Sequence, residues 1–447
     1  MSSRALAALC FCSLAAGCND HTIAGVVPRP TKAETHDVPV NGNRKLDLLF
    51  VIDDSGSMKA EQDSLRAHFK DFITRLSAID GGLPDVHIGI ISTDVGTGPN
   101  NDICSPLGDD GHLLTHACAG LDAGASFLSD QSIEGGRVRN YTGNLEDVFA
   151  CMADLGVKGC GAEQPLESMR LALDPARHTN PGFLRDDSLL AVVIISDEDD
   201  CSIRDRKLFT RPGSASSVVF GCTEDGIQCD EPDLRAFGDK HHCAARRDPT
   251  YLYDVDEYVD FLDRLRPDAE RLVVATITGQ PGCVRIESNP METGTPYLGQ
   301  LHECDGSIAG AAYPALRTAA FRDGFAKPTF VPIGNGDIAD AMDRVADAIV
   351  GHEGTFCITG QLADVDAHHD GAQYECAVSD VQYPHTSREQ ETVIGACDAS
   401  HSYKPCWSIV TDETACPSYP THQKIDIDRG GVAPLPETTV RAQCVTQ

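Results

Sequence analysis

The segment Asp53–Ser57, with the sequence DDSGS, carries a carboxylate on Asp53 and hydroxyls on Ser55 and Ser57. It follows the apolar run 46–52, which is typical of a strand buried on both faces. Gly56 allows a tight turn, and alternate positions in such a turn direct Ser55 and Ser57 at one point. Oxygen ligands of this kind suit Mg²⁺, Mn²⁺ or Ca²⁺. The alternative is that Ser55 or Ser57 only caps the helix that follows.

A second strand that ends in acidic residues supports the interpretation of Asp53–Ser57 as a metal site. The run SLLAVVIISDEDD predicts a buried strand that ends in acids, of which Asp197 is the first, and Asp199 and Asp200 add negative charge beside it. Since parallel strands present their carboxyl ends at one edge of a sheet, we expect Asp197 to lie near Asp53. Asp94, at the end of the strand predicted at 85–94, either faces the same edge or lies in a plain surface turn.

Together these residues resemble the metal-ion-dependent adhesion site (MIDAS) of von Willebrand factor A (vWA) domains. In that family a D-x-S-x-S motif supplies an Asp and two Ser, a loop between helices supplies a Thr, and an Asp follows a later strand. Asp53, Ser55, Ser57 and Asp197 match those positions, and the likeness covers roughly 45–350. The resemblance implies a binding module with a divalent cation, Mg²⁺ or Ca²⁺, and not an enzyme.

One position departs from the family pattern. The Thr of the family aligns with Glu163 in the loop GCGAEQPLESM. Glu163 either points into solvent or joins the metal shell, directly or through water. As a ligand it would add a third carboxylate, which favours Ca²⁺ because that ion accepts more oxygens in looser geometry. It would then fill the position that an acidic residue of a partner takes in the family.

The elements that must position these side chains alternate along the chain. Apolar runs predict strands at 46–52, 85–94, 188–200, 271–279 and 328–334, and helical spacing predicts helices at 60–79, 145–157, 165–173, 251–266 and 337–350. This alternation predicts an α/β domain over 45–351 with a doubly wound, mostly parallel sheet, vWA- or Rossmann-like. Insertions at about 201–250 and 279–312 follow strand ends, so we expect both at the ligand-binding edge.

The last part of the chain has a different pattern. Helical periodicity stops, and six cysteines accompany short apolar runs such as CWSIV, QKIDIDRG and TTVRAQCV. We therefore expect a small cysteine-rich β module over 352–447.

The N-terminus reads as a targeting segment. Arg4 precedes the apolar run 5–16, which is too short to span a bilayer, and SLAAGC resembles a bacterial lipobox that ends at Cys18. We expect a lipoprotein signal peptide over 1–18, lipid on Cys18 and a flexible tether over 19–44. Ala15 and Gly17 also fit an ordinary cleavage site.

The cysteine count favours lipidation. Of nineteen cysteines, two leave with the signal peptide and one carries lipid, so an even sixteen remain for disulfides in an oxidising compartment. Sequence proximity predicts the pairs Cys104–Cys118 and Cys151–Cys160. The run His241-His242-Cys243 suggests zinc only weakly, and an oxidised Cys243 is the favoured interpretation.

Charge and motifs narrow the function. A formal charge of −32 repels nucleic acid and anionic lipid, so membrane contact requires the lipid anchor. No G-x-S-x-G, H-E-x-x-H or P-loop motif occurs, so we assign no catalytic residue. We predict a cell-envelope lipoprotein, in the outer membrane or at the cell surface, that binds a protein or carbohydrate partner at a metal centre. The alternatives are a structural envelope protein with a closed, stabilising metal site, and a metal-dependent enzyme.

Overall fold

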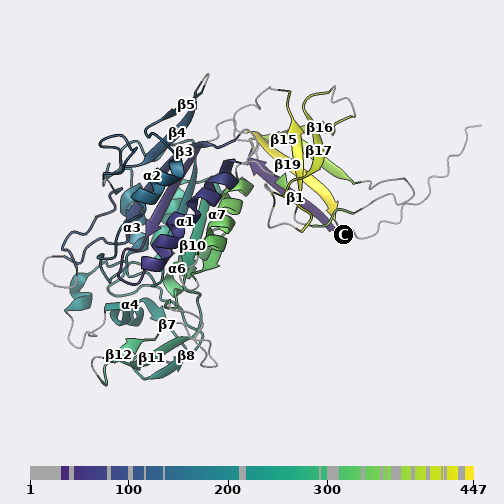
Figure 1. Cartoon of the computed structure of the whole chain (residues 1–447). Coiled ribbons are helices and arrows are strands. Elements are labelled where there is room, and N and C mark those ends of the chain that lie inside the picture. The colour runs from purple at the N-terminus through teal and green to yellow at the C-terminus, as the bar shows by residue number, and fades with distance from the viewer. Residues whose placement is uncertain are drawn as a thin grey trace, which may run out of the picture.

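Figure 1 shows the chain in a computed structural model. The structure describes residues 32–39, 45–77, 82–98, 104–114, 117–133, 136–210, 218–290, 293–299, 312–333, 338–352, 356–358, 360–363, 374–383, 388–398, 403–413, 416, 420–430 and 438–446. Two seven-stranded sheets organise these residues. In the described part of the chain, no helix is long and apolar enough to cross a membrane.

The larger domain contains a mostly parallel sheet, as the alternation of apolar runs predicted. Its strand order is β13-β10-β6-β2-β3-β4-β5. The first five are parallel, and β4 and β5 add an antiparallel hairpin at one edge. The strands are β2 (Lys45–Ile52), β3 (Asp85–Ser92), β4 (Leu128–Ile133), β5 (Gly136–Arg139), β6 (Leu189–Ser196), β10 (Leu272–Thr278) and β13 (Thr329–Pro332). Because the chain runs from β2 to β3 and then crosses to β6 on the other side of β2, the order reverses at β2, and ligands bind at such a point.

Helices cover both faces of this sheet. On one face lie α1 (Lys59–Ser77), α2 (Leu145–Met152) and α7 (Ala339–His352), and on the other α3 (Pro165–Leu173), α5 (Val255–Leu265) and α6 (Leu316–Asp323). Strand β2 is almost continuously apolar because both of its faces are buried. Phe50 and Ile52 pack on the side of α1, α2 and α7, and Leu49 and Val51 pack on the side of α3, α5 and α6. A strand buried on both faces is rigid, so it fixes the residues at its carboxyl end.

The two insertions form one small unit. The first contains the 3₁₀ helix η1 (Arg206–Phe209), α4 (Val218–Gly226), β7 (Ile227–Gln228), β8 (Gly238–Lys240) and β9 (Ala244–Ala245), and the second contains β11 (Val284–Ser288) and β12 (Pro296–Leu298). Strand β11 pairs with both β12 and β8, so the insertions share a sheet and a core. In Figure 1 this unit lies below the main sheet. A further 3₁₀ helix, η2 (Ala269–Arg271), precedes β10.

The second sheet contains the cysteine-rich module and one element that the sequence analysis did not predict. Its order is β1-β19-β15-β16-β17-β18-β14. Its later strands are β14 (Phe356–Cys357), β15 (Cys376–Gln382), β16 (Gln390–Ala396), β17 (Cys406–Thr411), β18 (Gln423–Asp428) and β19 (Thr438–Thr446). The added strand, β1 (Lys32–Pro39), lies within the segment predicted as a flexible tether and pairs antiparallel with β19 over its whole length (Figure 1). This part of the tether prediction is corrected, because backbone pairing with a distant strand orders a segment that has no apolar pattern of its own.

The predicted disulfide partners are wrong, although all four cysteines are bonded. The structure joins Cys104 to Cys160 and Cys118 to Cys151, where the sequence analysis paired Cys104 with Cys118 and Cys151 with Cys160. The fold packs the segment that contains Cys118 against α2, and the loop after β3 against the loop before α3. Bridges therefore join segments that are neighbours in space instead of neighbours in sequence.

The remaining described bridges lie in the insertion and in the second sheet. They are Cys201–Cys222, Cys229–Cys243, Cys357–Cys416, Cys376–Cys444 and Cys397–Cys406. The oxidised state predicted for Cys243 is thus confirmed. All six cysteines of the predicted β module are paired with one another.

Candidate metal centre

Asp53 is fixed where β2 ends. Its backbone N–H donates to the Ile195 carbonyl at 3.0 Å, which joins the ends of β2 and β6. The carboxylate is fully buried, and its oxygens accept from the Ser55 backbone N–H at 2.8 Å and the Ser196 hydroxyl at 2.6 Å. Burial raises the pKa of this carboxyl above its ordinary value. Asp53 is therefore held rigidly, with its charge poorly solvated.

The two serines and Asp197 form a row of oxygen atoms beside Asp53. The Oγ atoms of Ser55 and Ser57 lie 3.1 Å apart, and the Ser57 hydroxyl donates to Oδ1 of Asp197 at 3.2 Å. Helix α1 begins at Lys59, after both serines, so these hydroxyls bond across the row rather than serve only as caps. The structure thus brings together Asp53, Ser55, Ser57 and Asp197. Burial, with the neighbouring charge of Asp53, raises the pKa of Asp197 to about 7.

Glu163 points inward, which excludes the alternative that it faces solvent. The residue is 1% exposed, and its Oε2 accepts a hydrogen bond from the Thr93 hydroxyl. Its backbone carbonyl accepts from the Cys201 N–H at 2.7 Å, and its Oε1 is buried without a hydrogen-bond partner. Burial and then the charge of Asp53 raise the pKa of Glu163 well above its ordinary value. Sequence reasoning missed Thr93, which is an unremarkable residue after β3.

Asp54 is a further buried acid at this edge of the sheet. Its Oδ1 is buried without a hydrogen-bond partner, and burial, followed by the charges of Asp53, Asp94 and Asp109, raises its pKa to about 7. A Cβ on Gly159 would lie 2.2 Å from the Asp54 carboxyl carbon, so a side chain at this position would require Asp54 to move. Asp94 accepts from the Gly96 N–H at 2.8 Å, which makes a turn that also borders the site.

Two of the acids that follow Asp197 make contacts of their own outside the metal centre. Asp199 accepts from the backbone N–H groups of Leu316, Arg317 and Thr318 and so caps α6, while Asp200 pairs with Arg317 at 2.9 Å. Neither adds free charge to the metal centre, contrary to expectation.

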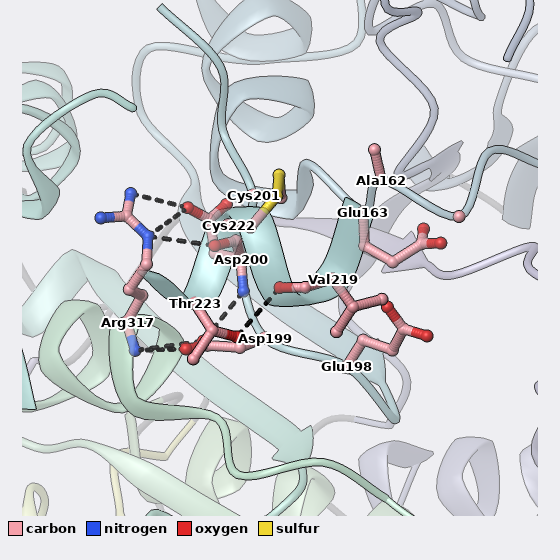
Figure 2. Close-up of a pocket in the computed structure, with 11 residues that line it drawn as sticks. Ala162, Glu163, Glu198, Asp199, Asp200, Cys201, Val219, Cys222, Thr223 and Arg317 are labelled. Atoms are coloured by element: carbon pink, nitrogen blue, oxygen red, sulfur yellow. Dashed lines mark hydrogen bonds and ion pairs between the residues drawn. A yellow bond between two sulfur atoms is a disulfide. The ribbon is translucent and has the colours of Figure 1, made fainter. Parts of the chain in front are cut away.

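Glu198, the remaining acid of this segment, lines a small cavity together with Glu163. Figure 2 shows a small cavity, with Asp199, Asp200 and Arg317 on one side and the carboxylates of Glu163 and Glu198 directed away from them on the other. The cavity volume is about 10 Å³, which is room for about one water molecule. Burial and the charges of Asp53 and Asp197 raise the pKa of Glu198 well above its ordinary value.

These donors fit a hard divalent cation better than they fit zinc. Ligand oxygens at about 2.0–2.1 Å from an octahedral Mg²⁺ lie about 3 Å apart, close to the spacings between Ser55, Ser57 and Asp197. Among the described residues, no three or more His, Cys, Asp or Glu side chains form a group that could hold a metal ion. The oxygens that the structure places at this spacing are the hydroxyls of Ser55 and Ser57 and Oδ1 of Asp197.

Comparisons with known proteins leave the family open. No family model matches the chain, and no curated protein matches it. Similar solved structures include the pilus adhesin SpaC from Lactobacillus rhamnosus GG in its open conformation, at 11% identity over 91% of this chain and 39% of that chain, with a TM-score of 0.32. A von Willebrand factor type A protein from Catenulispora acidiphila aligns at 10% identity, over 93% of this chain and 66% of that chain, with a TM-score of 0.28. The tip pilin GBS104 from Group B Streptococcus agalactiae aligns at 10% identity, over 93% and 81%, with a TM-score of 0.31.

The chain spans about two fifths of the length of the SpaC structures. Identities and scores this low support no conclusion about function. The function of this chain therefore has to be inferred from its own residues.

Proposed function

We propose that this chain is a cell-surface binding protein of the vWA type. It holds one divalent cation, Mg²⁺ or Ca²⁺, between the ends of β2 and β6 and binds a protein or carbohydrate partner there. Asp53, Ser55, Ser57 and Asp197 hold the ion, and Glu163 is an added ligand. The cation supplies a Lewis-acidic centre at an otherwise anionic surface, and the insertions frame it.

The observation that carries this proposal is the row of oxygens from Ser55 to Asp197. Three oxygen atoms at metal-ligand spacing lie beside buried carboxylates that lack a countercharge. Buried carboxylates in one place repel one another strongly unless a cation accompanies them. A bound divalent ion removes that repulsion and orders the loops that supply the ligands.

Calorimetry and thermal unfolding with Ca²⁺ and Mg²⁺ test the proposal. Binding should raise the unfolding temperature with the logarithm of ion concentration above the Kd. Ser57→Ala should weaken binding by about tenfold, because a direct ligand is lost. Ser77→Ala, at an exposed serine on α1 that bonds the Ile73 carbonyl, is the matched control and should leave binding unchanged. Equal binding by both variants, or none by the wild type, would overturn the metal centre.

A purely structural metal site is the second candidate, and the position of Glu163 favours it. A buried carboxylate that fills the coordination shell would close the ion to partners. Capture of a surface partner that a chelator abolishes, in protein that stays folded, supports the open site. Metal-dependent stability without metal-dependent capture supports the closed one. We propose no catalytic role.

The disulfides support an exported protein, because such bonds persist mainly in oxidising compartments. The signal peptide and Cys18 lie outside the described residues, so the lipid anchor and the outer-membrane location remain predictions. If Cys18 carries lipid, Cys18→Ala should release the protein from the membrane fraction, and continued membrane association would contradict the anchor.

A further inference from the structure

Three arginines gather where strands of the main sheet start, at the opposite end of the strands from the metal centre. They are Arg185, which precedes β6, Arg266, which follows α5, and Arg271, which precedes β10, and we call them the arginine cluster. Nη2 of Arg266 donates to the Arg185 carbonyl at 2.6 Å and to the Ser188 hydroxyl at 3.2 Å. Nη2 of Arg271 donates to the Asp186 carbonyl at 3.2 Å and to the Ser188 carbonyl at 3.5 Å. The short segment before β6 thus holds the three side chains together.

Only one member of the cluster has a carboxylate partner. Nε of Arg185 donates to Asp47 at 2.7 Å. In the ranges that the structure describes, no ion pair joins Arg266 or Arg271 to an acid. Their hydrogen bonds go to backbone carbonyls and one hydroxyl, which carry no charge. Two cations of the cluster therefore lack a counterion.

Arg266 has little access to water that could replace a counterion. It is 6% exposed. Burial lowers the pKa of Arg266 from its ordinary value, and the charge of Arg271 lowers it further. The charges of Asp47, Asp186 and Asp187 oppose the shift, but Asp47 already has its own partner and the other two are exposed to solvent. An arginine keeps its proton near neutral pH even when it is buried, so this positive charge persists.

The cluster also contains three buried N–H groups without an acceptor. They are Nη1 of Arg185, Nε of Arg266 and Nε of Arg271. Such groups are uncommon in folded proteins, and an ion or a water molecule is the usual explanation. A single water molecule accepts too few hydrogen bonds for donors on three guanidinium groups, and it brings no negative charge.

A tetrahedral oxyanion meets both requirements. Its oxygens accept hydrogen bonds from several directions, whereas a planar carboxylate presents two oxygens in one plane, and guanidinium groups pair closely with such oxygens. We propose that the arginine cluster binds a phosphate or sulfate group, held chiefly by Arg266 and Arg271 and bordered by Arg185. Because the parallel strands place this site away from Asp53 and Asp197, and because it requires no cation, it is independent of the proposed function.

Calorimetry with the full chain tests this site, in protein freed of divalent ions by chelation and dialysis. The probes are inorganic phosphate, inorganic sulfate and acetate at constant ionic strength. Phosphate and sulfate should bind saturably, and acetate at least about tenfold more weakly. Phosphate should also raise the unfolding temperature, because it binds only the folded chain.

Arg271→Gln removes one charge and one orphaned donor from a partly exposed residue, and it should weaken phosphate binding by about tenfold. The matched control is Arg246→Gln in the first insertion. Arg246 is also partly exposed and also donates to backbone carbonyls, those of Asp225 at 2.9 Å and Ile227 at 2.6 Å. The control removes the same charge and should change phosphate binding by less than about twofold.

Absence of saturable phosphate and sulfate binding, or equal losses in the two variants, would overturn the site. Acetate binding as tight as phosphate binding would overturn the tetrahedral ligand. Glycerol 3-phosphate distinguishes the source: binding like that of inorganic phosphate supports a phosphate group carried by a larger molecule, and its exclusion supports the free ion. Because no divalent ion is present, failure of this test leaves the metal centre standing, and failure to bind Ca²⁺ or Mg²⁺ leaves the arginine site standing.

Discussion

Glu163 should affect both the affinity for the cation and the stability of the metal-free protein. In metal-free protein its Oε1 is buried without a partner, an arrangement that costs about 1–3 kcal/mol. Glu163→Thr should therefore stabilise the chelated protein against thermal unfolding. The same change should weaken Ca²⁺ binding by about tenfold relative to Mg²⁺, because it removes a charged oxygen ligand. Calorimetry with each ion, and unfolding in chelator, measure both effects.

Glu163→Gln is the matched control for shape, since its side-chain oxygen still accepts from the Thr93 hydroxyl. It should reproduce the loss of Ca²⁺ affinity with a smaller gain in stability. Identical Ca²⁺ binding by wild type and both variants would show that Glu163 is not a ligand.

The sequence predicts Asp53, Ser55, Ser57 and Asp197 correctly as neighbours because each depends on a strand end. Strands β2 and β6 are parallel neighbours with Ile52 opposite Ile195, so the residues after them must meet. Thr93 and Glu198 escaped the analysis for a different reason. Thr93 directly follows β3 and Glu198 lies two residues after β6, but neither belongs to a motif that singled it out.

At the scale of elements, the Cys104–Cys160 bridge joins two loops that border the metal centre. Cys160 follows Gly159, which packs against Asp54, and precedes Glu163 by one short turn of chain. Replacing both cysteines with serine should cost about 2–4 kcal/mol of unfolding free energy. It should also weaken cation binding, because the loop that carries Glu163 is no longer held. Denaturant unfolding and calorimetry measure the two effects.

The Cys397–Cys406 bridge in the second sheet is the matched control. Its removal should lower the stability of that sheet and leave cation affinity unchanged. If both double variants bind the cation like the wild type, the Cys104–Cys160 bridge does not position the site.

The opposite edge of the main sheet contains a pH-sensitive contact. His87 of β3 is buried, its Nδ1 lies 2.7 Å from the Phe183 carbonyl, and its Nε2 lies 3.0 Å from the Gln131 amide nitrogen. Burial lowers its pKa from 6.5 and Arg185 lowers it further, while the Phe183 carbonyl, Asp47 and Asp85 oppose the shift. The native state therefore holds His87 neutral, and this contribution is complete above pH 6.5 and lost as pH falls toward the folded pKa.

We expect His87 to lower the unfolding free energy as pH falls below 6.5, by at most about 1.4 kcal/mol per pH unit. His87→Asn should remove this contribution, as measured by comparing denaturant unfolding of the variant and the wild type at successive pH values. His68→Gln, on the partly exposed surface of α1, is the control and should leave the slope unchanged. An unchanged slope in the His87 variant would contradict the assignment.

The prediction of helices and strands succeeded for long segments with a regular apolar pattern. The helices predicted at 60–79 and 165–173 and the strand at 85–94 correspond to α1, α3 and β3, because each has an unbroken apolar pattern. The hairpin of β4 and β5 went unpredicted, since its residues are mostly polar and half-exposed. The sheet shared by the two insertions depends on pairing between β8 and β11, which no local pattern encodes.

For the whole molecule, the pairing of β1 with β19 changes the domain organisation. The chain begins its described part in the second sheet, passes through the entire α/β domain, and returns to the second sheet at β14. The α/β domain is thus inserted into the cysteine-rich module. The sequence analysis predicted a tether where β1 lies, because the strand that pairs with it, β19, is at the far end of the described chain.

Deleting residues 32–39 should therefore destabilise the second sheet and leave the metal centre intact. Strand β1 is at the edge of that sheet, and its loss uncovers the backbone N–H and C=O groups of β19 along Thr439–Thr446. We expect faster amide hydrogen exchange in β19 and β15, a lower unfolding temperature for the module, and unchanged cation affinity. Deletion of residues 19–31 alone is the control, since it removes the rest of the predicted tether and spares β1. If the two deletions give the same exchange rates in β19, then β1 contributes nothing to the sheet, and the tether prediction would apply to the whole segment before β2.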